Sequence, residues 1–141
     1  WNPGNRYANR NLLDHGTLYV ARFHEDGTGE WVDLVFGKHR LTATGGFDSQ
    51  ADVLIRARAA ADAVNATKLD RPEWIAVSPL NADVYCTLTN NSQRGGKDRA
   101  GTDAANPRAE NVFGHVLRWS EEGGDPGSTA AFRWVRSSRC C

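Results

Sequence analysis

The pattern of apolar and polar positions predicts mostly short β-strands. Residues 17–23 (TLYVARF) and 30–35 are rich in β-branched and aromatic side chains, which favours strands. Asp26-Gly27 lies between them and is a strong hairpin signal, because tight hairpin turns need residues that accept positive φ. Further strands are expected at residues 73–77, 83–89, 114–119 and 129–135. The polar segment 90–108 is long for a connection, which indicates a functional or partner-related reason for it.

One segment has the pattern of a helix instead. Residues 50–64 (QADVLIRARAAADAV) contain neither glycine nor proline. Val53, Leu54, Ala57, Ala60, Ala61 and Val64 recur at helical spacing. Asp48 or Ser49 is a suitable N-cap. The pattern predicts an amphipathic surface helix.

Together these elements predict a mainly β fold, a partial β-propeller of one to two blades with one inserted amphipathic α-helix. Four consecutive strands with short turns fit one blade, and the first hairpin fits part of another. Such blades leave sheet edges that need covering. Residues 1–141 are therefore expected to form a single partial domain, a fragment of a larger propeller, and the lack of any methionine fits an N-terminal truncation. The segment 136–141 is expected to be a frayed or non-native-like tail.

Composition limits the possible partners. Lys plus Arg and Asp plus Glu number 17 each, and this balance argues against a dedicated nucleic-acid surface. No apolar run is long enough for a membrane span. Of the three cysteines, Cys86 lies in a strand-like run and is interpreted as a small buried residue, not a ligand.

The best candidate for chemistry is the segment Asp70-Arg71-Pro72-Glu73-Trp74. Pro72 biases Arg71 toward an extended conformation, in which Arg71 and Glu73 would project to the same side. An arginine fork suits phosphate oxygens, and a carboxylate suits a hard cation. The alternative is an ordinary solvated Arg–Glu ion pair, which spacing alone favours.

Asparagines form a second group of candidates. Asn90 and Asn91 could contact a phosphate or calcium, although turn capping is the simpler interpretation. Asn111 lies in another polar phrase, just before His115. A strand histidine such as His115 is more often packed or hydrogen-bonded than a ligand.

Several phrases resemble the PhoX-type alkaline phosphatases. They are NRNLLDHGTLYVARF, ADVLIRARAAADAVNATKLDRPEWIAV, YCTLTNNS and NPRAENVFGHVLRW, and they occur in the expected order from about Asn5 to Trp134. The resemblance implies a periplasmic or secreted bacterial β-propeller enzyme that hydrolyses phosphomonoesters with calcium and iron. It also implies that Arg71 contacts phosphate and that Glu73 binds metal. Asn90, Asn91 and Asn111 lie in family-like phrases without individual roles.

The departures from the family matter as well. The family's metal-ligating cysteine phrase has no match here, and further acidic ligands and later blades are missing. The resemblance therefore implies little activity of this chain alone. Two alternatives stay open: a non-catalytic propeller module that binds calcium or a partner protein, and a calcium-dependent propeller lactonase.

Overall fold

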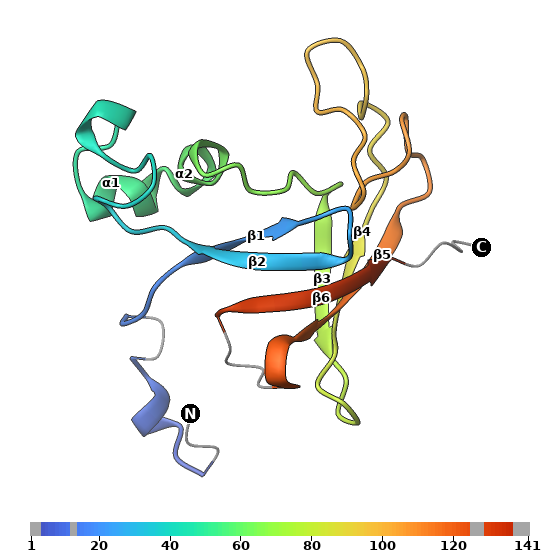
Figure 1. Ribbon diagram of the computed structural model, residues 1–141. Coiled ribbons are helices and arrows are strands. Elements are labelled where there is room, and N and C mark those ends of the chain that lie inside the picture. Colours follow the sequence, from blue (N-terminus) through green and yellow to red (C-terminus); the bar gives the residue numbers. More distant parts are fainter. Residues whose placement is uncertain (1–3, 12–13, 125–128, 137–141) are drawn as a thin grey trace. The chain divides into compact units, whose positions relative to one another are not determined.

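A computed structural model describes residues 4–11, 14–124 and 129–136 (Figure 1). The chain groups into two compact units. One contains residues 1–20 and 33–64, and the other contains residues 21–32 and 65–141. No helix among the described residues is long and apolar enough to cross a membrane.

The main feature is an antiparallel sheet, which confirms the mainly β prediction. Its six strands are β1 (Tyr19–Phe23), β2 (Thr28–Asp33), β3 (Pro72–Val77), β4 (Val84–Leu88), β5 (His115–Glu121) and β6 (Ala131–Arg136). Their order is β1-β2-β6-β5-β4-β3. Strands β3 to β6 thus form the four-stranded meander expected of a propeller blade.

The first hairpin joins this same sheet. Gly29 of β2 pairs with Phe132 of β6, so the hairpin extends the meander, whereas the sequence interpretation placed it in another blade. Its turn is the expected one: Gly27 has φ +81°, and Asp26 Oδ1 accepts a hydrogen bond from Thr28 N at 2.9 Å. Gly29 has no room for a side chain, because a Cβ there would lie 2.1 Å from the Phe132 ring.

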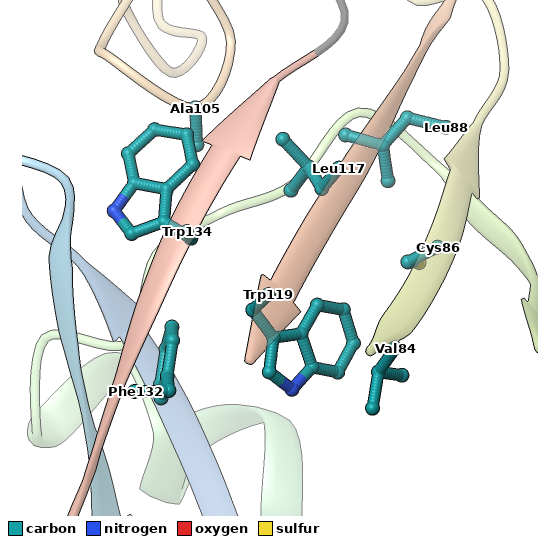
Figure 2. Packing of buried hydrophobic residues seen from close by; sticks show 8 residues of the cluster. All are labelled: Val84, Cys86, Leu88, Ala105, Leu117, Trp119, Phe132 and Trp134. Carbon is teal, nitrogen blue, oxygen red and sulfur yellow. The ribbon is translucent and has the colours of Figure 1, made fainter. Parts of the chain in front are cut away.

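One face of β4, β5 and β6 carries the apolar core of the larger unit (Figure 2). Buried and exposed residues alternate along β4, as the two-residue period of a strand requires. The cluster contains Val84, Cys86, Leu88, Ala105, Leu117, Trp119, Phe132 and Trp134. Cys86 is 3% exposed, as predicted for a packed strand residue, and burial raises the pKa of its thiol.

The smaller unit contains the helical segment. The sequence predicted one helix over 50–64, but the structure has α1 (Gln50–Ile55) and α2 (Ala57–Ala63). Arg56 separates them with non-helical φ −102° and ψ 36°. Its guanidinium donates to the Gly46 carbonyl at 2.8 Å, which ties this residue to the preceding loop. Ser49 caps α1, since its Oγ accepts from Asp52 N at 3.1 Å.

The helical segment packs largely as expected. Val53, Ala60 and Val64 are buried. Leu54, which the pattern placed on the apolar face, is wrongly assigned because it is 47% exposed. Of the expected tail, Arg136 is the last residue of β6, and residues 137–141 lie outside the described residues.

The described residues also contain three short 3-10 turns. They are η1 (Tyr7–Asn9), η2 (Ala43–Gly45) and η3 (Glu122–Gly124).

Candidate functional site

The segment before β3 has an unusual backbone. Arg71 has φ +46°, so it is left-handed rather than extended, and that prediction was wrong. Local hydrogen bonds overcome the bias from Pro72: Arg71 N donates to Leu69 O at 3.0 Å, and Arg71 O accepts from Thr89 N at 3.2 Å. The argument that Arg71 and Glu73 share one side of an extended stretch therefore does not hold.

Arg71 meets Asn90 instead. The Nη1 of Arg71 donates to Asn90 Oδ1 at 3.0 Å. Both residues line an open pocket of about 360 Å³, together with Asn91, Ser92 and Gln93. This lining contains one positive charge and no carboxylate, so its electrostatics favour an anion.

Glu73 lies at an irregular point of the sheet. The register between β3 and β4 shifts between Pro72 and Trp74, where Glu73 lies. Its side chain is exposed, and within the described part of the chain it makes no hydrogen bond or ion pair. The structure thus does not pair the Glu73 carboxylate with Arg71 and leaves it exposed to solvent.

The residue before Arg71 has a buried carboxylate, for which no separate role was predicted from the sequence. Asp70 is 0% exposed. Its Oδ1 accepts from Arg94 Nε at 2.7 Å and from Asn91 Nδ2 at 2.8 Å. Its Oδ2 accepts from Asn111 Nδ2 at 3.3 Å, and its backbone N donates to Asn106 Oδ1 at 2.8 Å. We call this group the Asp70 cluster; it comprises Asp70, Asn91, Arg94, Asn106, Asn111 and His115.

Arg94 is the only cationic side chain of the cluster and is 2% exposed. Its Nη1 donates to Gly101 O at 2.9 Å, and its Nη2 donates to Lys68 O. The arginine therefore joins the segment before β3 to the long loop between β4 and β5. No local pattern marks Arg94 in the sequence, since it lies in a polar stretch without periodicity.

Asn91 and Asn111 have largely structural contacts. Asn91 Oδ1 accepts from Gln93 N at 3.2 Å, which confirms the turn-capping interpretation for this residue. The Asn91 backbone N donates to Asn111 O at 2.6 Å. Asn111 is 2% exposed, and its Oδ1 accepts from Gly114 N at 3.1 Å. The structure thus brings Arg71, Asn90 and Asn91 together at the pocket, and the side chains of Asn91 and Asn111 donate to Asp70.

His115 is packed and hydrogen-bonded, as predicted. It is 3% exposed, and its Nε2 lies 2.6 Å from Ala105 O. A carbonyl only accepts, so Nε2 carries the proton and Nδ1 faces Asn111 Nδ2 at 3.5 Å as the acceptor.

A metal cluster would need several ligands close together. The described residues contain no group of three or more His, Cys, Asp or Glu side chains placed to hold an ion. Cys86 is enclosed by the apolar core and belongs to no such group among the described residues. These residues therefore do not fit a complete calcium and iron site by themselves.

The comparisons with known proteins agree with the phrases in the sequence. The family model described as alkaline phosphatase PhoX matches residues 1–138. The chain belongs to this family. This confirms the resemblance that the sequence indicated. A search of curated proteins gave no match.

A solved structure is also similar to this PhoX-family chain. It is Pseudomonas fluorescens PhoX in complex with vanadate, a transition-state analogue, with 50% sequence identity and a TM-score of 0.87. The match covers 95% of this chain and 24% of that one. The chain thus spans about a quarter of the length of the solved relative.

Proposed function

We propose that this chain carries a phosphate-binding part of a phosphatase that hydrolyses phosphomonoesters. The observation that supports this most directly is the Arg71–Asn90 pair at a polar pocket lined without any carboxylate. Family membership and the vanadate complex of the relative support the same reaction class.

The two side chains complement a phosphoryl group. Arg71 is exposed, and its guanidinium has further N–H donors besides the one given to Asn90. Asn90 accepts that bond through Oδ1, so its Nδ2 is the group left to donate. Two fixed donors of this kind would hold the phosphoryl oxygens and stabilise charge that develops on them during transfer.

We further propose calcium and iron as cofactors of the full enzyme, with Glu73 as one metal ligand. Metal ions in phosphatases polarise the phosphoryl group and neutralise its charge. Because the described residues do not form a complete site, the other ligands would come from outside them. Asn91 and Asn111 would then support the site from below, through Asp70. A periplasmic or secreted location and contact with further propeller blades are part of the same proposal.

Binding of phosphate analogues tests the proposal. Wild-type chain is titrated with orthovanadate and inorganic phosphate and followed by ⁵¹V and ³¹P NMR. Arg71→Ala is expected to weaken binding about tenfold or more, since a hydrogen bond to a charged group contributes about 1.5–3 kcal/mol. Arg99→Ala is the matched control, because Arg99 is exposed on the same loop but does not line the pocket. Equal affinities of Arg71→Ala and wild type would contradict the proposal.

Activity assays separate the alternatives. The chain is incubated with iron and calcium and a chromogenic phosphomonoester, and little turnover is expected. Lactone hydrolysis without phosphatase activity would favour the lactonase. Calcium binding with no affinity for either oxyanion would favour a non-catalytic calcium-binding module.

A further inference from the structure

Asp70 and Arg71 are neighbours in the chain but belong to different environments. The Asp70 carboxylate is fully buried, whereas the Arg71 side chain is exposed at the pocket. Their partners are also neighbours: Asp70 accepts from Asn91, and Arg71 donates to Asn90. Two adjacent bonds thus join the same two segments, one part-buried and one open to solvent.

The Asp70 cluster holds the loop to the segment before β3. Every side-chain bond of the Asp70 carboxylate goes to the loop, to Asn91, Arg94 and Asn111. A buried ion pair is weak support for stability as such, because removing two charges from water offsets much of their attraction. Its best-attested use is to fix one arrangement of the chain.

The part of the chain that this bonding fixes is the backbone at Arg71. A non-glycine residue at φ +46° is strained and persists only where its surroundings determine it. The preceding residue is anchored by its carboxylate, and Arg71 O is held by Thr89, which directly precedes Asn90. The strained backbone therefore lies between two fixed points, at the residue that contacts the pocket.

We propose that Asp70 is a positioning residue, which acts through Arg94 and Asn91 to hold Arg71 in its left-handed conformation against Asn90. The assignment of Arg71 to phosphate rests on the proposed function, whereas the conformational part does not. Asp70 itself touches no substrate.

Asp70→Asn tests the proposal because it keeps the shape and removes the charge that faces Arg94. Arg71 is expected to lose the strong intraresidue amide–Hα NOE that marks positive φ. Affinity for orthovanadate and inorganic phosphate is expected to fall about tenfold, by analogy with residues that orient metal-ligating side chains. Wild-type φ at Arg71 together with wild-type affinity would overturn the proposal.

Asp83→Asn is the matched control for general destabilisation. Asp83 is also buried, at 6% exposure, and accepts from Ser120 Oγ at 2.5 Å and Asn81 Nδ2 at 2.9 Å. It precedes β4, whereas Asn90 follows the other end of that strand. Asp83→Asn is expected to leave the Arg71 NOE and oxyanion affinity unchanged, and an equal loss in both variants would overturn the proposal.

Arg94→Lys is a second variant that tests the same proposal if Asp70→Asn does not fold. Lysine keeps the charge beside Asp70 but lacks the fork that reaches Gly101 O and Lys68 O. An intermediate loss of the NOE and of affinity is expected, and no change would overturn the proposal. If the wild-type chain binds neither oxyanion, the proposed function fails, and the NOE alone decides whether Asp70 positions Arg71.

Discussion

The larger unit has two buried regions that are held together in opposite ways. The first is the aromatic part of the core on the sheet, where Phe132 lies 5.0 Å from Trp31 and 5.1 Å from Phe23 between ring centroids. The second is the Asp70 cluster, in which direction and distance matter for each bond. The stabilisation from apolar packing scales with the buried area and volume of the side chains. A buried polar group that lacks a hydrogen-bond partner instead destabilises the fold, because it has lost its hydrogen bonds to water.

This difference shows where the structure can tolerate change. Among the described residues, no buried side-chain nitrogen or oxygen lacks a hydrogen-bond partner. The Asp70 cluster is therefore fully satisfied, and removing one member leaves others unpaired. Loss of an aromatic side chain is therefore expected to act on the whole sheet, and loss of a cluster member on the loop.

The largest expected effect is on the aromatic core. Phe132→Ala is expected to lower the free energy of unfolding by about 3–5 kcal/mol, because it leaves a cavity among Phe23, Trp31 and Trp119. Urea denaturation followed by tryptophan fluorescence measures the change. Val135→Ala is the control on the same strand, since Val135 is 50% exposed. Similar losses in both variants would show that the core does not depend on this ring.

A smaller and more local effect is expected in the Asp70 cluster. Asn106→Ala removes the acceptor of Asp70 N, in a buried bond, and a donor to Lys68 O, in a part-buried one. Unpaired buried polar groups cost about 1–3 kcal/mol. Hydrogen exchange is expected to speed up in the loop 90–111 and to leave the amides of β5 and β6 protected. Uniform loss of protection across the sheet would contradict the separation of the two regions.

The two regions also differ in how far the sequence reveals them. The strands follow from alternation, and Val84, Cys86 and Leu88 occupy the buried positions of β4 as a two-residue period requires. Asp26-Gly27 specifies its hairpin through turn chemistry. These signals are local, so they can be recognised in the sequence without knowledge of the tertiary structure.

The candidate site depends on contacts that no local pattern encodes. Asp70 and Arg94 are 24 residues apart, and each is an ordinary charged residue in a polar stretch. Arg71 was predicted extended from Pro72 alone, but its bonds to Leu69 and Thr89 determine the actual conformation.

The break at Arg56 also follows from a contact that no local pattern encodes, because the Arg56 side chain donates to the carbonyl of Gly46, which precedes the helix. The family resemblance located Arg71 and Glu73, while the Asp70 cluster required the structure.

The smallest expected effect concerns Asp33 in the smaller unit, a half-buried carboxylate with exposed partners. Asp33 accepts hydrogen bonds from Lys38 Nζ at 2.5 Å and from His39 Nε2 at 2.9 Å, and these partners are largely exposed. The hydrogen bond from Lys38, followed by that from His39, lowers the pKa of Asp33 below its usual 3.8. A ¹³C NMR titration of the Asp33 carboxyl is expected to give a midpoint below 3.8. Lys38→Gln is expected to bring that pKa closer to its usual value.

The sign of the effect on stability follows from that direction. Because the pKa of Asp33 is lower in the folded state, its stabilising contribution is present above the unfolded value and is lost as pH falls through the folded value. The stability difference between wild type and Asp33→Asn is therefore expected to shrink below about pH 3.8. Exposed ion pairs contribute little because solvent screens them. If Asp33→Asn lowered the free energy of unfolding as much as Asn106→Ala does, burial would not be the reason why breaking the Asp70 cluster destabilises the fold.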